Sequence, residues 1–286
     1  MANVKIVTDS SAQLTPEEIQ KFDITVVHLS VMIDGETFDD HKKISNDQFV
    51  KLMLQSKKLP TTSQPPVGKF VDAFNQLGQA GNKVVCITMM NQLSGTFHSA
   101  QSAAQQSDTD VSVVDSQSTD RGLAFQVLNA AQLALSGADV AEILAKVKKV
   151  REHTHLEMGV MTLDNIVKGG RLNPVAGAIT NFLKIKIILE IQQGQDKGQL
   201  KVAAKGRGIK FVKKYFNNVI AGMKNMNDLK MIGLSYVSPT KLIDEITSDL
   251  RVSFPNVPLL YRVTTPIIAT HAGQGAFALI YYDDPD

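Results

Sequence analysis

The sequence predicts an α/β protein of two domains, with a parallel-sheet domain followed by an α+β domain. Short apolar runs that suit buried strands alternate with longer segments of helical pattern. Near residues 183–205 two strand-like runs flank a turn at residues 193–197, where Gly and Asp are typical of an antiparallel hairpin. We place the boundary near residue 153, which gives an N-terminal domain of residues 1–153 and a C-terminal domain of residues 154–286.

The first strand-loop-helix unit lies at the start of the chain. The run VKIVTDS, residues 4–10, is typical of a buried strand that ends in polar residues. Thr15 then supplies an N-cap hydroxyl, Pro16 suits the first helical position, and Glu17 and Glu18 place acids in the first turn. A helix is therefore predicted to begin at Pro16.

Four more strand-helix pairs follow the same pattern, and two further elements lie around the domain boundary. The pairs are KVVCITMM (83–90) with SGTFHSAQSAAQQ (94–106), VSVVDS (111–116) with RGLAFQVLNAAQLALS (121–136), KMIGLSYV (230–237) with SPTKLIDEITSDL (238–250), and VPLLYRV (257–263) with PIIATHAG (266–273). An amphipathic helix is predicted over residues 139–153, and a strand begins at residue 154. Ligands of such sheets collect at the carboxyl ends of the strands.

Polar clusters follow several of these strands. They comprise residues 8–11 (TDSS), residues 94–96 (SGT) and residues 115–116 (DS). Ser, Thr and Asp are also ordinary helix caps and turn formers, so each cluster alone has a structural explanation as well as a ligand-binding one. The segment KKLPTTSQPPVG (57–68) adds four polar side chains between prolines, and we predict a stiff loop that presents them.

Composition excludes several classes of protein. The net charge is only +2 and the basic residues are scattered, so no nucleic-acid partner is expected. Cys86 lies in an apolar run, which suits a buried thiol in a reducing compartment and allows no internal disulfide. The N-terminus lacks the pattern of a signal peptide, and no run is long enough to span a membrane. A cytoplasmic location is expected.

Familiar catalytic and cofactor motifs are missing from the sequence. There is no phosphate loop, dinucleotide-binding glycine motif, zinc-protease motif or nucleophile elbow, and no cofactor is expected. His153 and His155 lack Cys or acidic companions in a metal-ligand pattern, so we predict no metal site. His271, in THAGQGA, has a structural and a functional interpretation. A small hydrolase or acyl-handling enzyme that uses Ser94 and His271 remains an alternative, and Asp9 would complete a hydrolase triad, although no spacing selects it.

Seven segments taken in order closely resemble the bacterial DegV family, and the resemblance covers essentially the whole chain. They are TDSS (8–11), PTTSQP (60–65), LSGTFHSA (93–100), VVDS (113–116), GGRLNP (169–174), LKIKIIL (183–189) and THAGQGA (270–276). The resemblance implies a two-domain lipid-binding protein that holds a long-chain fatty acid between its domains. Some members are the substrate-binding subunit of a fatty acid kinase, whose separate ATP-dependent subunit makes acyl phosphate. The chain itself would then not be an enzyme, and transient contact with a membrane belongs to the same expectation.

The resemblance also implies site residues. The carboxyl-binding residues of the family fall on Thr61, Thr62, Ser63, Ser94, Gly95 and His271. Three more positions, Arg171, Asp9 and Ser10, are secondary candidates, and Arg171 is expected to brace the region between the domains. Hydroxyl and backbone N–H donors can hold a carboxylate without neutralising it, which leaves an oxygen open to phosphorylation.

Three positions depart from the family pattern. Ala203 stands where members that work with a kinase commonly have arginine, which weakens the assignment of a kinase partner, although Lys205 and Arg207 are close in sequence. Ile187 replaces a usual proline, and Ala278 a usual glycine. We expect local changes of backbone or tunnel shape and no change of fold.

Overall fold

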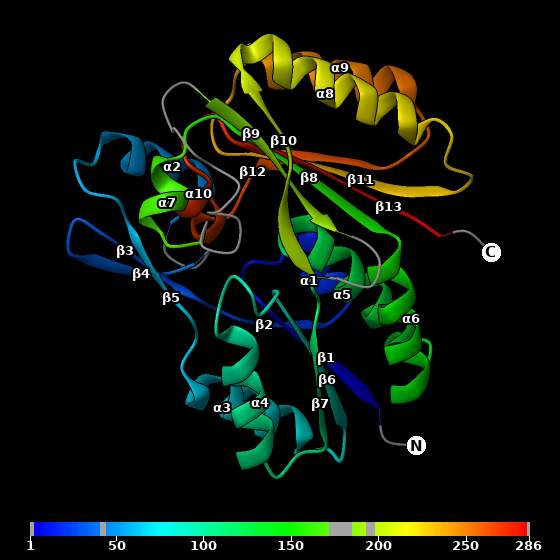
Figure 1. Ribbon diagram of the computed structural model, residues 1–286. Helices are drawn as coiled ribbons and strands as arrows, with labels where there is room; N and C mark the ends of the chain where they lie inside the picture. Colours follow the sequence, from blue (N-terminus) through cyan, green and yellow to red (C-terminus); the bar gives the residue numbers. More distant parts are fainter. Residues whose placement is uncertain (1–2, 41–43, 172–184, 193–197, 285–286) are drawn as a thin grey trace.

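The computed structural model describes residues 3–40, 44–171, 185–192 and 198–284. Within them the chain forms a parallel sheet, a larger mixed sheet and a small antiparallel sheet (Figure 1). The α/β fold class predicted from the sequence is confirmed. The strands of the parallel sheet all precede residue 153 and those of the mixed sheet all follow it. The boundary at residue 153 agrees with this division and stays a prediction.

The parallel sheet has the strand order β2-β1-β6-β7. Its strands are β1 (Val4–Asp9), β2 (Ile24–Val27), β6 (Lys83–Thr88) and β7 (Val111–Asp115). Phe70 of α3 (Val67–Gly78) and Ala100 of α4 (Thr96–Gln106) pack on one face, against Cys86 and its neighbours. Helices α5 (Asp120–Leu135) and α6 (Val140–Glu152) cover the other face. Buried strands with side chains packed on both faces explain the continuous apolar runs in the sequence.

The mixed sheet has the order β10-β9-β8-β13-β11-β12 and is antiparallel except for the β11-β12 pair. Its strands are β8 (Thr154–Val160), β9 (Ile185–Gln192), β10 (Gln199–Arg207), β11 (Leu229–Tyr236), β12 (Leu259–Val263) and β13 (Phe277–Asp283). Helices α8 (Gly208–Met223) and α9 (Lys241–Ser253) cover one face (Figure 1). The predicted hairpin is present as β9 and β10, and its turn at residues 193–197 lies outside the described residues.

Helix α5 lies between the two larger sheets. It packs on β1 of the parallel sheet and on β8, β11 and β13 of the mixed sheet. Phe125 of α5 is fully buried in the core under the mixed sheet, with its ring centroid 5.9 Å from that of Tyr282. Eleven residues of α5 are buried, which is why this helix is apolar nearly all round.

The third sheet, β4-β3-β5, was not predicted. It joins β3 (Ser30–Ile33), β4 (Glu36–Asp39) and β5 (Thr61–Ser63), and it lies beside α2 (Asn46–Gln55), α7 (Asp164–Lys168) and α10 (Pro266–Ala272). The prediction of a loop at residues 61–63 is therefore wrong. Prolines flank the segment without interrupting it, so Thr62 can pair with Val31 across an antiparallel ladder.

The predicted helix start at Pro16 is confirmed. Helix α1 (Pro16–Lys21) has Thr15 as its N-cap, and Thr15 Oγ1 accepts a hydrogen bond from Glu18 N at 3.2 Å. The Glu18 carboxylate accepts in return from Thr15 N at 2.9 Å. This capping box satisfies two donors that the helix itself leaves unpaired. The same carboxylate receives the Arg121 guanidinium, so it also ties α1 to α5.

Candidate functional site

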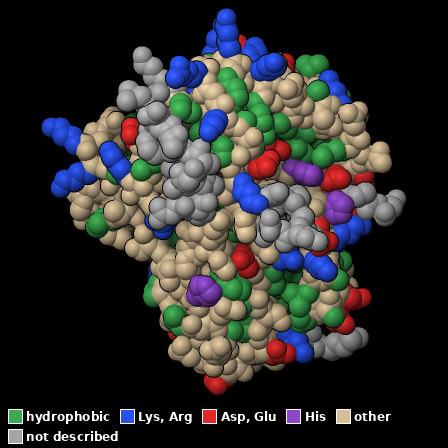
Figure 2. Space-filling view, in the orientation of Figure 1, with side chains coloured by type: hydrophobic (Ala, Val, Ile, Leu, Met, Phe, Trp, Pro, Cys, Tyr) green, Lys and Arg blue, Asp and Glu red, His purple; other side chains and the backbone are tan. Residues whose placement is uncertain are grey.

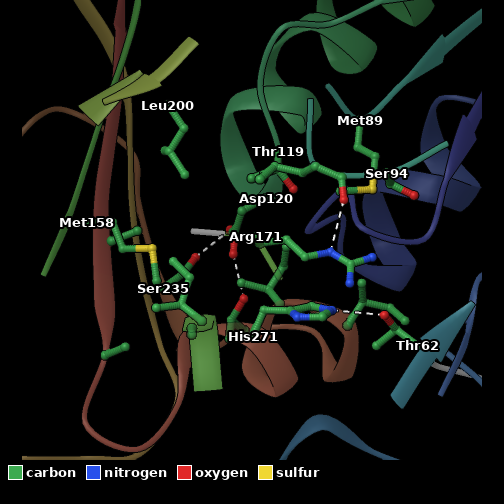
Figure 3. Close-up of a pocket in the computed structure, with 18 of the residues that line it drawn as sticks. Thr62, Met89, Ser94, Thr119, Asp120, Met158, Arg171, Leu200, Ser235 and His271 are labelled. Carbon is green, nitrogen blue, oxygen red and sulfur yellow. Dashed lines mark hydrogen bonds between the residues drawn. The ribbon is translucent and has the colours of Figure 1, made fainter. Parts of the chain in front are cut away.

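A cavity of about 350 Å³ lies where the three sheets meet α10. Its volume falls in the range of roughly 300–1,000 Å³ that is usual for ligand pockets. Much of the wall is apolar and comes from both halves of the chain, including Leu29, Met89, Leu93, Met158, Leu200 and Ile267. Polar side chains lie in two groups, one around His271 and one around Asp120 (Figure 3). Such a cavity suits a long apolar ligand with a polar end.

The His271 group forms one polar end of the cavity. His271 Nε2 lies 2.9 Å from Thr62 Oγ1, which joins α10 to β5 (Figure 3). His271 Nδ1 is buried and has no hydrogen-bond partner. Burial, with a smaller contribution from the positive charge of Arg171, lowers the pKa of His271 to about 4. The imidazole is therefore neutral at physiological pH.

A neutral His271 has two tautomers, and they present different groups to a ligand. With the proton on Nδ1, the ring has a buried N–H donor without an acceptor, and its Nε2 accepts the Thr62 hydroxyl hydrogen. With the proton on Nε2, the ring donates to Thr62 Oγ1, and the Thr62 hydrogen is released toward the cavity. The second tautomer leaves no buried N–H unpaired and turns Thr62 into a donor for an anion.

Arg171 lines the cavity beside His271 and is anchored by backbone carbonyls. Its Nε donates to Leu93 O at 3.2 Å and its Nη1 donates to Gly169 O at 2.6 Å. These bonds join the end of α7 to the loop before α4 and hold a positive charge near the cavity, which favours an anionic ligand there. The expected bracing of the region between the domains by Arg171 stays a prediction.

Ser94 and Gly95 line the cavity at the start of α4. Gly95 is the N-cap residue of this helix, and Ser94 Oγ lies 2.8 Å from Thr96 Oγ1. A Cβ atom on Gly95 would lie 2.2 Å from Gln64 Oε1, so the glycine permits the close approach of the β5 end. The first N–H groups of a helix favour negative charge nearby. The polar end therefore combines hydroxyl donors, a helix start and one guanidinium.

The structure brings together six of the nine candidate residues. Thr62, Ser63, Ser94, Gly95, Arg171 and His271 all line the cavity, whereas Thr61, Asp9 and Ser10 do not. Thr61 is exposed on β5, and Ser10 Oγ accepts a hydrogen bond from Leu29 N at 3.0 Å. The ligand roles of the nine residues stay predictions.

Asp9 is a fully buried carboxylate with local partners. It accepts hydrogen bonds from Ser11 N at 2.9 Å, Ser11 Oγ at 2.6 Å and Met89 N at 2.7 Å. Burial raises its pKa, and these three hydrogen bonds act in the opposite direction. His271 is instead bonded to Thr62, so Asp9, His271 and Ser94 form no hydrogen-bonded relay.

Several polar residues of the cavity wall were not predicted from the sequence. Among them are Thr119, Asp120, Ser235 and Thr264. Ser235 ends a strand whose carboxyl end was expected to hold ligands, so its position in KMIGLSYV was a usable signal. The sequence gives no comparable signal for Asp120, because an acidic residue at the start of a helix is typical of an ordinary N-cap.

The described residues contain no candidate metal site. Among them, no group of three or more His, Cys, Asp or Glu side chains is arranged to hold a metal ion. His153 Nδ1 and His155 Nε2 lie 3.7 Å and 3.5 Å from Asp283 Oδ1, and the His155 ring stacks on Tyr281. Helices long and apolar enough to cross a bilayer are likewise missing from that part of the chain.

The comparisons with known proteins agree on one family. The sequence model described as "Uncharacterised protein, DegV family COG1307" matches residues 3–284. The chain belongs to the DegV family. A DegV domain-containing protein of Streptococcus pneumoniae is 40% identical over 280 residues, which cover 98% of each chain. The family membership inferred from the seven segments is confirmed.

Solved structures of the DegV family share the fold. The crystal structure of DegV, a fatty acid binding protein from Bacillus subtilis, has a TM-score of 0.89 at 25% identity and covers 99% of this chain and 100% of its own. The Streptococcus pneumoniae Fatty Acid Kinase (Fak) B3 protein loaded with linoleic acid has a TM-score of 0.81 at 22% identity, covering 99% and 100%. At 22% identity, the similarity to the Fak B3 protein shows a shared fold alone.

The three departures from the DegV pattern lie at different places. Ile187 is fully buried in β9, and Ala278 of β13 lines the cavity. Ala203 lies at the irregularity of β10, between Val202 and Ala204, where the register with β9 shifts. The cavity wall therefore carries one of the three changes, at Ala278.

Proposed function

We propose that this protein binds a long-chain fatty acid in the 350 Å³ cavity, with its carboxylate at the His271 end. The observation that carries the proposal is the Thr62–His271 pair at the polar end of a largely apolar cavity. Thr62 donates to one carboxylate oxygen, while Ser94 and the start of α4 offer further donors. Arg171 supplies the positive charge without closing around the ligand, because two of its nitrogens are bonded to backbone carbonyls.

The acyl chain supplies most of the binding free energy. Each buried CH₂ group contributes about 0.8 kcal/mol, so a dozen methylene groups offer on the order of 10 kcal/mol before the cost of ordering the chain. The apolar wall contributed by Leu29, Met89, Met158, Leu200 and Ile267 provides this environment. Few polar contacts are then needed at the carboxylate, which can stay reactive. Membership of a family with fatty-acid-binding members supports the same ligand class.

The carboxylate would be presented to a separate, ATP-dependent fatty acid kinase subunit. Thr61, Ser63 and Gln64 are exposed around half-buried Thr62, so the polar end lies near the protein surface. A carboxylate held there by hydroxyl groups keeps an oxygen available for phosphorylation by a partner. The described residues contain no relay of Ser94, His271 and Asp9, which supports binding over hydrolysis.

Mass spectrometry of an organic extract tests the proposal first. Protein purified without added lipid is expected to release a C16 to C18 fatty acid in stoichiometric amount, and delipidated protein to take up labelled oleate. A fatty acid kinase subunit with ATP should then convert the bound acid to acyl phosphate. Empty protein that also rejects oleate and palmitate would exclude the carrier function. Hydrolysis of an acyl ester by the protein alone, lost on Ser94→Ala, would favour the hydrolase.

A further inference from the structure

Asp120 is a buried acid in the cavity wall with a strained backbone. It is only 2% exposed, begins α5 and lines the cavity. Its φ is +54°, in the left-handed region that L-residues other than Asn and Asp rarely adopt. Strained residues at ligand cavities persist when surrounding contacts hold them. The contacts that hold Asp120 here include side-chain hydrogen bonds with Ser235 and Thr264.

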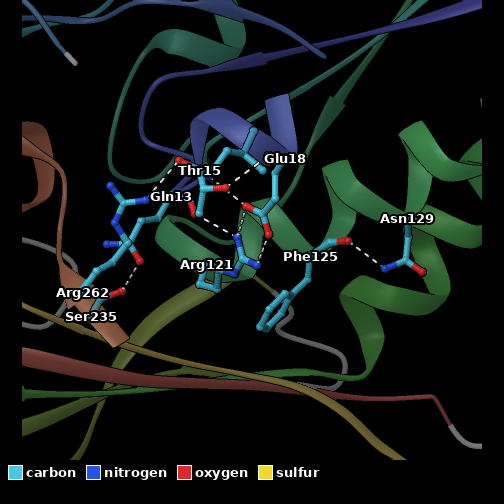
Figure 4. A network of polar contacts seen from close by, with 9 residues as sticks. Gln13, Thr15, Glu18, Arg121, Phe125, Asn129, Ser235 and Arg262 are labelled. Atoms are coloured by element: carbon cyan, nitrogen blue, oxygen red, sulfur yellow. Dashed lines mark hydrogen bonds and ion pairs between the residues drawn. The ribbon is translucent and has the colours of Figure 1, made fainter. Parts of the chain in front are cut away.

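Ser235 lies between two acceptors in these contacts. Its Oγ is 2.6 Å from Asp120 Oδ1 and 2.7 Å from Gln13 Oε1 (Figures 3 and 4). The orientation of the Gln13 amide is fixed, because its Nε2 donates to Val263 O at 3.0 Å. A serine hydroxyl has one hydrogen and cannot donate to both oxygens. One further proton is required between Asp120 and Gln13.

We propose that Asp120 is a neutral carboxylic acid at physiological pH and acts as a positioning residue for the fatty-acid site. The proton lies on Oδ1 and is donated to Ser235 Oγ, whose own hydrogen is donated to Gln13 Oε1. Asp120 Oδ2 accepts from Thr264 Oγ1 at 2.5 Å, and Oδ1 also accepts from Arg121 N at 2.7 Å. Every polar hydrogen in this hydrogen-bond network then has one acceptor.

This network links the cavity wall to the histidine end. Thr264 lies immediately before Thr265, the N-cap of α10, and α10 carries His271. By bonding Ser235 of β11 and Thr264, Asp120 fixes the start of α10 against α5. The proton also keeps the wall uncharged, so a fatty acid anion enters without repulsion from a second carboxylate. The role rests on the proposed function, whereas the protonation can be tested without it.

The charges around Asp120 do not replace that proton. Arg121, on the same helix, donates to both oxygens of Glu18 on α1 and to Gln13 O, so it is already paired (Figure 4). Arg262 of β12 points to Leu14 O at 3.5 Å, and His271 of α10 is neutral. Burial raises the pKa of Asp120, opposed by its hydrogen bonds with Ser235 and Thr264. The raised pKa of Asp120 agrees with the extra proton that the hydrogen-bond geometry requires.

Carbon-13 NMR of labelled aspartate tests the protonation directly. At pH 7 the Asp120 carboxyl signal, assigned by its loss in Asp120→Asn, is expected at the position of a protonated acid. Gln13→Met removes the acceptor that draws the Ser235 hydrogen, so Ser235 can donate to Asp120 and its titration should move to lower pH. A carboxylate signal at pH 7 in the native protein would overturn the proposal. So would a Gln13→Met titration identical to the native one.

Oleate affinity measured across the pH range in which the NMR titration shows Asp120 losing its proton tests the positioning role. Above the pKa of Asp120 the native affinity should fall by about tenfold per pH unit, because binding requires the protonated form. Asp120→Asn should show no such decline. In the native protein, the His271 ring signals in the NMR spectrum should change over the same pH range as Asp120 loses its proton. Glu157→Gln is the control, since burial raises the pKa of Glu157, outside the cavity, to about 8.

The two readouts separate the two proposals. Matching pH profiles for the native protein and Asp120→Asn, or His271 signals that ignore Asp120, would refute the positioning role. Failure of every variant and of the native protein to bind oleate would refute the proposed function and with it this role, while the NMR result still decides whether Asp120 is neutral. A Glu157→Gln profile that loses the decline would assign the titration to Glu157 and refute the role of Asp120.

Discussion

At the scale of single residues, the chemistry of the site depends on a histidine that stays uncharged. His271 is half-buried, bonds Thr62 through Nε2 and lies near the positive charge of Arg171. An imidazolium there would meet an unfavourable charge in a poorly solvated place. A neutral ring can instead orient the Thr62 hydroxyl toward a carboxylate. His271 then positions Thr62, and Thr62 donates the hydrogen bond to the ligand.

The low pKa of His271 predicts a stability change with pH. The folded-state pKa of about 4 lies below the usual value of 6.5, so the unfolded chain binds more protons between these pH values. Stability from this residue is present above pH 6.5 and is lost as pH falls toward 4, by roughly 3 kcal/mol in total. Urea unfolding at pH 7.0 and 4.5 should show a smaller loss for His271→Gln than for the native protein. Equal losses in both proteins would contradict the assignment.

Thr62 should contribute directly to carboxylate binding. Thr62→Val keeps the β-branched shape that suits β5 but removes the hydroxyl, so oleate affinity should fall about tenfold to hundredfold. Thr37→Val, on exposed β4, is the matched control and should leave affinity unchanged. Titration of delipidated protein with a fluorescent fatty acid measures both. An equal affinity in the two variants would remove Thr62 from the site.

The sequence predicted individual residues well where a motif carried them. Thr62, Ser94 and His271 lie in segments that resemble the family, and the structure places all three on one cavity. Asp120 was missed because its role depends on tertiary structure: it lies 115 residues before Ser235 in the sequence, and only folding brings the two side chains within 2.6 Å. No local pattern encodes that contact.

At the scale of elements, the contact between α7 and α10 sets the position of His271. Asn165 Nδ2 of α7 donates to Thr270 O of α10 at 2.9 Å. Gly169, at the end of α7, lies so close to α10 that a Cβ atom there would be 2.4 Å from His271 Nδ1. The glycine is required by this approach and not by its φ of −72°.

Gly169→Ala should therefore displace His271. The added methyl group would also lie 2.9 Å from Asn165 O, so the backbone of α7 must shift as well. We expect a stability loss of about 1–3 kcal/mol and weaker oleate binding. Gly222→Ala in α8, where nothing lies within 4 Å, is the control and should be neutral or stabilising. Calorimetry and oleate titration of both variants check this, and a Gly169→Ala protein that binds normally would disprove the close packing.

Helices and strands were predicted correctly where the sequence has a clear local pattern. Strands β1, β6 and β7 are continuous apolar runs because both of their faces are packed, and their helices have clear starts. The small sheet was missed because β3, β4 and β5 are only three or four residues long and carry polar side chains. The hydroxyl groups of Thr61–Ser63 suggested a loop, but this segment forms a strand because its backbone pairs with β3.

At the scale of the whole molecule, the two larger sheets share α5 and the cavity. Side-chain bonds add to this junction: Gln13 and Asn46 both donate to Val263 O at 3.0 Å. On the face shown in Figure 2, uncharged side chains separate the Lys and Arg side chains, which form no continuous basic surface there. Buried side-chain bonds therefore join the two halves of the molecule in addition to α5 and the cavity wall.

A fatty acid in this cavity should stabilise both sheets together. At a free oleate concentration 100 times its Kd, the free energy of unfolding should rise by about 2.7 kcal/mol. Because the wall includes Met89, which follows β6, and Met158 of β8, hydrogen exchange should slow in the parallel and the mixed sheet alike. Oleyl alcohol has the same chain without the carboxylate, so it should stabilise both sheets less at equal concentration. Protection confined to one sheet would show that the ligand does not bridge them, and equal stabilisation by the alcohol would show that the His271 end does not hold the carboxylate.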